Sequence, residues 1–245
     1  MEIWAMTDIG LVRKENQDAY MVTQNTPDGR TVCVVCDGLG GSAGGKMAST
    51  LAVETFTQEL QKVLTAEMTA DQMKEAAAYA VSLANAAVGK AAAETVEYRN
   101  MGTTLVAAIA GGEEVVCVNV GDSRAYHICE GGIRRITKDH SLVERMVDQG
   151  EITAEEARHH PSRNLITRAL GLDTDAQCDK FLCSLAAGEY ILLCTDGLSG
   201  TVTDQEMLFE VIHGGDPSTC LDRLLEIARS QGAPDNVTAV LMRKL

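Results

Sequence analysis

The chain has 245 residues, of which 45% are hydrophobic, and its formal net charge is −14. This size suits one domain with a sizeable core, and no Pro-, Gly- or Ser-rich linker divides it. The negative charge would repel nucleic acid and anionic membranes, so neither is an expected partner. The start of the chain lacks a basic, apolar leader, and no apolar stretch approaches about 20 residues, so we expect a cytoplasmic protein.

Apolar runs and helical periodicity predict an alternation of strand groups and helix pairs. Strands are expected at residues 3–7, 19–23 and 31–36, and helices at 44–64 and 69–98. Strands follow at 103–110, 114–120, 123–129 and 133–137. The last elements are strands at 177–182, 189–194 and 236–242 and helices at 203–212 and 217–231. Strand meanders before and after helix blocks favour antiparallel sheets with helices packed outside, an α+β layered fold.

Residues 139–165 differ from the segments around them. They are charged, carry two short helical patterns at 141–149 and 153–158, and end in His159-His160-Pro161. This composition predicts an excursion on the surface.

Two similar segments each place an aspartate at the end of a buried strand. They read VCVVCDGLGG (32–41) and ILLCTDGLSG (191–200), so Asp37 and Asp196 are expected at the lip of a sheet. Gly38 and Gly197 follow them and would let a carbonyl or a ligand approach closely. Asp-Gly is also a common turn dipeptide, and a single such site would favour that simpler interpretation.

Further acids stand near strand ends, with Asp235 before the last strand and Asp18 before the second. Clustered carboxylates repel one another unless a positive charge joins them, and Mg²⁺ or Mn²⁺ is the natural candidate. Zinc would require Cys or His, and the sequence shows no suitable grouping of them. Arg13 could bind a phosphate with two hydrogen bonds, although most isolated arginines have no such role.

Gly121-Asp122 joins two expected strands in VNVGDSRAYHI. Gly-X is an ordinary two-residue hairpin turn, so a turn and a metal ligand are both open interpretations of Asp122. Cys33 and Cys36 form a C-x-x-C within an extended run, where they would point to opposite faces. We therefore expect the cysteines to be mostly buried free thiols.

A glycine cluster offers a rival interpretation. Residues 40–46 match G-x-x-x-x-G-K, but Met47 stands where a P-loop has Ser or Thr, and residues 38–43 also read G-x-G-x-x-A. Either pattern would indicate a nucleotide-binding switch. Both are imperfect, and neither explains an aspartate directly before the first glycine.

Taken in order, a series of segments resembles the metal-dependent type 2C protein serine/threonine phosphatases in their compact bacterial form. They are TDIGLVRKENQDAY, VVCDGLGGSAGGKMAS, MGTTLVAA, VNVGDSRAY, TKDHSLVERMVDQGEIT, HPSRNLITRALG, LLCTDGLSGTVTDQE and APDNVTAVLM. The resemblance implies a four-layer α-β-β-α sandwich, with two antiparallel sheets flanked by helices. Residues 1–245 would then form a single catalytic domain, with residues 139–165 as a flap beside the active site.

The resemblance implies two tightly bound cations, Mn²⁺ or Mg²⁺, in a cleft at one edge of the sheets. Asp37 would bridge the two cations. The carbonyl of Gly38 would bind one of them, and Asp196 and Asp235 would bind the other.

The remaining roles belong to residues around these ligands. Asp18 would act on a cation through water, Asp122 would share a third, labile cation with Asp196, and Arg13 would bind the substrate phosphate. Two departures from the family are visible. Gln17 stands where many members have Glu, and Leu39 stands where many eukaryotic members have His.

The implied activity is hydrolysis of phosphoserine and phosphothreonine in proteins by water activated between two cations, with no phospho-enzyme. Expected partners are phosphorylated proteins, among them a bacterial serine/threonine kinase. The alternative is a non-catalytic regulator that keeps the fold and only binds phosphoproteins. The retained metal ligands argue against that alternative.

Overall fold

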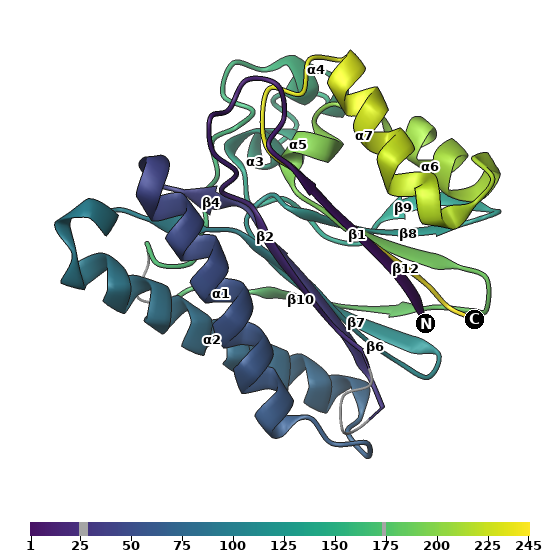
Figure 1. The fold of residues 1–245 in the computed structure, drawn as a ribbon, viewed down its shortest axis with the longest axis horizontal. Helices are drawn as coiled ribbons and strands as arrows, with labels where there is room; N and C mark the ends of the chain where they lie inside the picture. Colours follow the sequence, from purple (N-terminus) through teal and green to yellow (C-terminus); the bar gives the residue numbers. More distant parts are fainter. Residues whose placement is uncertain (25–28, 173–174) are drawn as a thin grey trace.

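The structure is a computed structural model that describes residues 1–24, 29–172 and 175–245, apart from the side chains of residues 42 and 43. Two five-stranded antiparallel sheets pack against each other (Figure 1). The first sheet has the order β1 (Glu2–Asp8), β12 (Val237–Arg243), β11 (Tyr190–Cys194), β8 (Arg124–Cys129) and β9 (Gly132–Arg135). The second has the order β10 (Asp179–Ser184), β7 (Glu114–Val120), β6 (Leu105–Gly111), β3 (Thr31–Cys36) and β2 (Ala19–Thr23).

Helices cover the outer face of each sheet (Figure 1). The long helices α1 (Gly41–Val63) and α2 (Ala70–Glu94) pack on the second sheet, and a short 3₁₀ helix, η1 (Val96–Tyr98), follows them. On the first sheet lie α6 (Asp204–His213) and α7 (Cys220–Ser230), which are separated by the 3₁₀ helix η2 (Pro217–Thr219). The α+β prediction and the four-layer α-β-β-α order are therefore confirmed.

Alternation along the strands divides the core into three layers. In β3, Val34 and Cys36 face α1 and α2, whereas Cys33 and Val35 face the other sheet. The prediction that the C-x-x-C cysteines point to opposite faces is thus confirmed. All eight cysteines of the chain are free.

Local sequence signals set the start of the main helices. Thr69 accepts a hydrogen bond from the backbone N–H of Gln72, whose side chain in turn accepts one from the Thr69 backbone, and this capping box begins α2. Thr203 and Glu206 form the same motif at the start of α6. Three of the seven buried residues of α2 are alanines, and these small side chains let the helix pack closely on the sheet.

Three local features differ from the sequence predictions. Residues 38–39 and 102–103 pair as the short strands β4 (Gly38–Leu39) and β5 (Gly102–Thr103), and the short helix α5 (Asp196–Ser199) begins at Asp196. Of the two open interpretations of Gly121-Asp122, the hairpin turn is wrong, because β7 and β8 belong to different sheets. These two residues instead carry the chain from one sheet to the other, with Gly121 at a φ of 103°.

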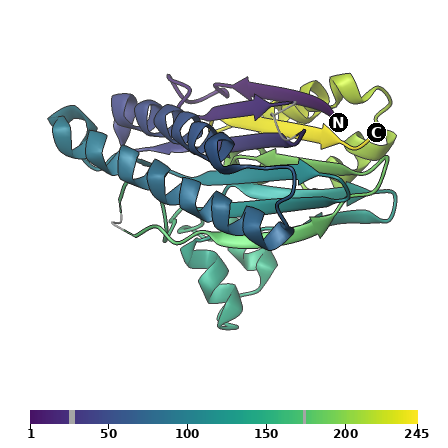
Figure 2. The same ribbon diagram turned by 90° about the horizontal axis from the view of Figure 1, so that it is seen from below.

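Residues 139–165 leave the sandwich after β9, and their helices α3 (Leu142–Asp148) and α4 (Ala154–His159) project from the body (Figure 2). The base of the excursion is closed by a bridge between Ser141 and Ile166 and by the N–H of Thr167, which donates to the carbonyl of His140. Within the described ranges, no helix has both the length and the apolar character required to cross a membrane.

Candidate metal centre and active site

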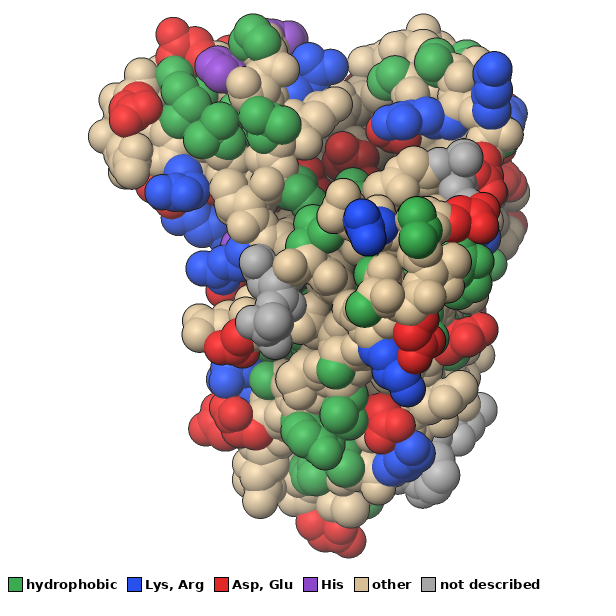
Figure 3. Space-filling model, turned by 90° about the vertical axis from the view of Figure 1, so that its left-hand side faces the viewer, with side chains coloured by type: hydrophobic (Ala, Val, Ile, Leu, Met, Phe, Trp, Pro, Cys, Tyr) green, Lys and Arg blue, Asp and Glu red, His purple; other side chains and the backbone are tan. Residues whose placement is uncertain are grey.

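A cleft of about 400 Å³ lies where several strand ends meet. Figure 3 shows acidic side chains at the floor of a hollow between two raised parts of the surface. All residues nominated from the sequence except Asp18 line this cleft, namely Arg13, Asp37, Gly38, Asp122, Asp196 and Asp235. The structure therefore brings together residues that lie more than two hundred positions apart in the chain.

The packing of the two sheets explains this convergence. Asp37 directly follows β3 of the second sheet, and Asp196 lies just beyond β11 of the first. Asp235 precedes β12, which pairs with β11, and Asp122 lies on the crossover between the sheets. Each carboxylate is thus placed at the same edge of the sandwich by a buried apolar strand.

Hydroxyl groups hold the backbone of Asp37. Its N–H donates to Thr104 Oγ1 at 2.9 Å, and its carbonyl accepts from Thr103 Oγ1 at 2.8 Å and from the N–H of Thr104 at 2.9 Å. The Thr104 hydroxyl is also 2.7 Å from Ser123 Oγ, beside Asp122. The positions of Asp37 and Asp122 are therefore linked through two buried hydroxyls.

Asp18 lies behind the cleft and is only 2% exposed. Thr195 Oγ1 donates to Asp18 Oδ2 at 2.9 Å, and the N–H of Thr238 donates to the same Thr195 hydroxyl at 3.0 Å. Thr195 is the residue directly before Asp196. One hydroxyl thus fixes the buried carboxylate relative to the cleft.

Asp18, Asp37, Asp122 and Asp196 have raised pKa values because burial disfavours their charged forms and neighbouring carboxylates repel them. Burial, together with the charges of Asp196 and Asp235, raises the pKa of Asp18 to about 7. Burial and the charge of Asp235 raise the pKa of Asp196 to about 6. For Asp37 and Asp122, burial and nearby aspartates raise the pKa well above its ordinary value.

These features fit a divalent cation bound by oxygen ligands. In the described part of the chain, the buried Oδ1 atoms of Asp18 and Asp196 have no hydrogen-bond partner. Carboxylate and carbonyl oxygens are the donors that Mg²⁺ and Mn²⁺ prefer. Among described residues, no three of the cleft aspartates have oxygens within 4.8 Å of one another. A cation would relieve the mutual repulsion of these carboxylates.

Arg13 lies at the mouth of the cleft, and its side chain is 53% exposed. Its Nη2 donates to Asp235 Oδ2 at 2.5 Å, and this hydrogen bond raises the pKa of the guanidinium, which stays charged. The loop that carries Arg13 is held by Asn236, whose side-chain amide donates to the carbonyls of Ile9 and Glu15. Sequence analysis did not identify Asn236, although it directly follows Asp235.

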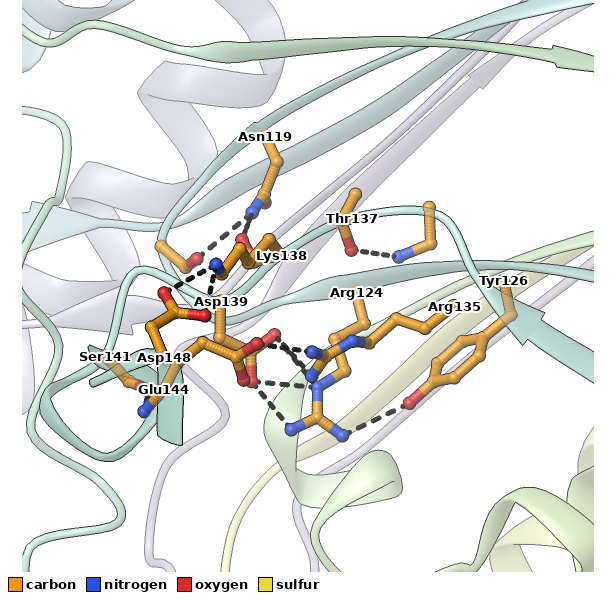
Figure 4. Close-up of polar contacts among 12 residues, drawn as sticks. Asn119, Arg124, Tyr126, Arg135, Thr137, Lys138, Asp139, Ser141, Glu144 and Asp148 are labelled. Atoms are coloured by element: carbon orange, nitrogen blue, oxygen red, sulfur yellow. Dashed lines mark hydrogen bonds and ion pairs between the residues drawn. The ribbon is translucent and has the colours of Figure 1, made fainter. Parts of the chain in front are cut away.

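The sequence also gave no sign of an ion pair between Arg124 and Asp139 (Figure 4). Arg124 Nη2 donates to Asp139 Oδ2 at 2.6 Å, and its Nε lies 3.0 Å from both carboxylate oxygens. The pKa values of Asp122 and Asp196 are raised overall, but the positive charge of Arg124 acts in the lowering direction on both. It thereby offsets part of the repulsion between the two carboxylates. Asp139 begins the excursion, so this pair joins the crossover to the base of residues 139–165.

A second ion pair extends that connection. Arg135 Nη2 donates at 2.6 Å to Glu144 Oε1 on α3 (Figure 4). The excursion also reaches the cleft itself, because Asn164 and Ile166 line it. The only sequence signal for these contacts was the charged composition of the segment.

The glycine cluster has a packing role. A Cβ at Gly38 would lie 2.1 Å from the carbonyl oxygen of Gly45, so glycine is required where β4 meets α1. Lys46 Nζ donates to the backbone carbonyl of Asp18 at 2.9 Å. These contacts use the residues that the nucleotide-binding interpretation would assign to a phosphate.

Comparison with known families decides between the interpretations. Residues 12–242 match the model of the family described as protein phosphatase 2C. The chain belongs to the protein phosphatase 2C family. It is a metal-dependent serine/threonine protein phosphatase of the bacterial type, similar over its full length to proteins of that activity.

Three relatives illustrate the similarity. The serine/threonine phosphatase stp of Listeria monocytogenes is 35% identical, over 97% of this chain and 94% of that protein. The crystal structure of Stp1 from Staphylococcus aureus has a TM-score of 0.91 at 36% identity, covering 100% of this chain and 95% of that chain. The catalytic domain of the phosphatase PstP, solved with two manganese ions, has a TM-score of 0.84 at 32% identity, covering 98% of this chain and 96% of that chain.

The structure shows what Gln17 and Leu39, the two departures from the family pattern, contact in this phosphatase. Gln17 donates from its side-chain amide to the carbonyl of Gly41 at 2.7 Å. Leu39 lines the cleft and has no proton to give. Neither substitution removes an oxygen donor among the residues nominated as direct ligands.

The raised pKa values predict how the stability of the metal-free phosphatase depends on pH. Asp18 and Asp196 bind protons more tightly in the folded chain than in the unfolded chain, where an aspartate titrates near ~3.9. The folded state therefore carries more protons between about pH 4 and 7, so these groups lower the free energy of unfolding as pH rises. In excess chelator, the free energy of unfolding of wild type should therefore fall relative to that of Asp18→Asn as the pH rises through this range.

Thermal unfolding at several pH values in excess chelator would measure this difference. The exposed change Asp71→Asn on α2 is the matched control and should not reproduce the gain that Asp18→Asn shows as pH rises. Saturating Mn²⁺ should stabilise wild type most at the high end of the range. A stability difference between wild type and Asp18→Asn that does not change with pH would contradict the electrostatic account.

Proposed function

We propose that the acidic cleft is the active centre of this phosphatase and that it hydrolyses phosphoserine and phosphothreonine in proteins. The observation that carries the proposal is the convergence of four aspartates on one cleft, next to an arginine at its mouth. Buried carboxylates with raised pKa values are characteristic of functional sites. The aspartates outnumber Arg13, so a phosphate dianion would meet a net positive charge in the cleft only when cations are bound.

Two cations, Mn²⁺ or Mg²⁺, would be held by Asp37 between them, by the carbonyl of Gly38 on one side and by Asp196 and Asp235 on the other. When bound, they would lower the pKa of a shared water and neutralise charge on the phosphoryl oxygens. The PstP catalytic domain with two manganese ions supports this number.

The other residues of the cleft would orient water and substrate. The Oδ1 atom of Asp18, buried without a partner among the described residues, would accept a hydrogen bond from a water in the cleft. Arg13 would leave Asp235 when a cation takes up the charge of that carboxylate. Its guanidinium could then donate two hydrogen bonds to the phosphoryl oxygens.

Asp122 would share a third, labile cation with Asp196. Asp122 is 9% exposed and lines the cleft. The backbone does not require an aspartate at this crossover, because Gly121 supplies the positive φ. Two protein carboxylates offer few ligands, so this cation would bind more weakly than the other two.

We also propose that residues 1–245 act as one catalytic domain with residues 139–165 as its flap. Asn164 and Ile166 bring the flap to the cleft, and the Arg124–Asp139 and Arg135–Glu144 pairs anchor its base. Its substrates would be phosphorylated proteins, and a bacterial serine/threonine kinase would be one of them.

The purified phosphatase should hydrolyse an aryl phosphate and a phosphothreonine peptide when Mn²⁺ or Mg²⁺ is present. Chelation should stop both reactions, and added metal should restore them, because the nucleophile depends on the cations. Release of inorganic phosphate is the measurement. Full turnover in excess chelator would overturn the metal mechanism, and binding of the phosphopeptide without turnover would favour the non-catalytic regulator.

Arg13→Ala should mainly raise KM for the phosphopeptide, by about 10- to 100-fold, since a hydrogen bond to a charged group is worth about 1.5–3 kcal/mol. The variant should also be less sensitive to inhibition by inorganic phosphate. Steady-state kinetics would separate KM from kcat. Lys62→Ala, an exposed basic residue of α1, is the control. An unchanged kcat/KM in Arg13→Ala would show that Arg13 does not bind the substrate phosphate.

A further inference from the structure

Three metal-binding side chains meet at the opposite end of the first sheet from the acidic cleft. His127 and Cys129 are two residues apart on β8, so their side chains point to the same face. Glu189 directly precedes β11, which pairs with β8 through Ile191 and His127. Asp196 lies beyond the other end of β11, and the length of that strand separates the two places by about 20 Å.

The donor atoms of these residues are close together. One nitrogen of His127, the sulfur of Cys129 and one carboxylate oxygen of Glu189 all lie within 4.8 Å of one another. His127 Nε2 is 2.9 Å from Glu189 Oε2. All three residues are half-buried, which leaves a path for an ion from solvent.

We propose that His127, Cys129 and Glu189 bind a zinc ion at a site separate from the catalytic cleft. Zinc bonds of about 2.0–2.3 Å at tetrahedral angles would place the three donors about 3.3–3.6 Å apart. The His127–Glu189 pair is already near that spacing. Rotation of the Cys129 side chain would close the rest of the distance.

The carboxylate of Glu189 is held in position for this role. Its Oε2 accepts from the backbone N–H of Ala186 at 2.9 Å, and that hydrogen bond and the one with His127 lower the pKa of Glu189. The carboxylate is therefore ionised at neutral pH. Its backbone is tied to the end of the chain, because the N–H of Lys244 donates to the carbonyl of Glu189.

Charge balance also suits zinc. A dication bound by one thiolate and one carboxylate is neutral overall. This matters because the positively charged Arg134 lies opposite His127 on the neighbouring strand β9. The guanidinium of Arg134 already donates to Cys183 Sγ at 3.3 Å. A neutral site would therefore add no net repulsion beside that arginine.

The donor set separates this site from the acidic cleft. Nitrogen and sulfur ligands favour zinc, whereas the oxygen ligands of the cleft favour Mg²⁺ and Mn²⁺. Binding through Nε2 requires the neutral tautomer of His127 that carries its ring hydrogen on Nδ1, and it releases the thiol proton of Cys129 to solvent. Three protein ligands leave the fourth position for water. The bound ion would join β8 to β11 and stabilise that end of the sheet.

Cobalt(II) is the probe that distinguishes the two sites. A thiolate bound to cobalt gives a near-ultraviolet charge-transfer band, which carboxylate ligands in the cleft cannot produce. In excess Mg²⁺, wild type should gain this band with one equivalent of cobalt, and zinc should abolish it. Cys129→Ser should not show the band, and His127→Gln and Glu189→Gln should bind cobalt more weakly.

Cys178→Ser, at another half-buried cysteine, is the matched control and should keep the band. Phosphatase turnover with Mg²⁺ should be unchanged in Cys129→Ser, which shows that the variant is folded. Zinc in excess Mg²⁺ should raise the Tm of wild type but not of Cys129→Ser. The proposal is overturned if wild type shows no band, or if Cys129→Ser shows the same band as wild type.

Discussion

Repulsion between buried aspartates dominates the edge of the sandwich where the cleft lies. Packing of the two sheets brings Asp37, Asp122, Asp196 and Asp235 to one cleft, with Asp18 buried behind them. Burial and the nearby carboxylates raise the pKa of Asp18, Asp37, Asp122 and Asp196. Arg13 and Arg124 supply only part of the opposing charge, and we propose that divalent cations supply the rest.

The surrounding polar residues maintain this unfavourable arrangement. Thr104 and Ser123 link Asp37 to the crossover, Thr195 holds Asp18, and Asn236 ties the Arg13 loop to the start of β12. These hydrogen bonds position the carboxylates without adding positive charge. They hold carboxylate and carbonyl oxygens together at one edge of the sandwich, as phosphoryl transfer by positioned cations would require.

Local sequence patterns predicted the strands, the helices and the strand-end aspartates, because burial and periodicity are encoded over a few residues. Asp122 shows what such local patterns cannot predict. The strands on either side of it were compatible with a hairpin, but the packing of both sheets decides whether two consecutive strands pair. The Arg124–Asp139 pair and the His127–Glu189 pair join residues 15 and 62 positions apart, so only the folded chain reveals them. The ligand roles came from the family resemblance and stay predictions.

Counting bound manganese tests whether the aspartates of the cleft bind the catalytic cations. Equilibrium dialysis should find two tightly held ions in wild type and also in Asp122→Asn, the matched control from the same cleft. Asp37→Asn should retain fewer than two and lose phosphopeptide turnover while keeping its fold by circular dichroism. Two tightly bound ions and wild-type turnover in Asp37→Asn would contradict the account.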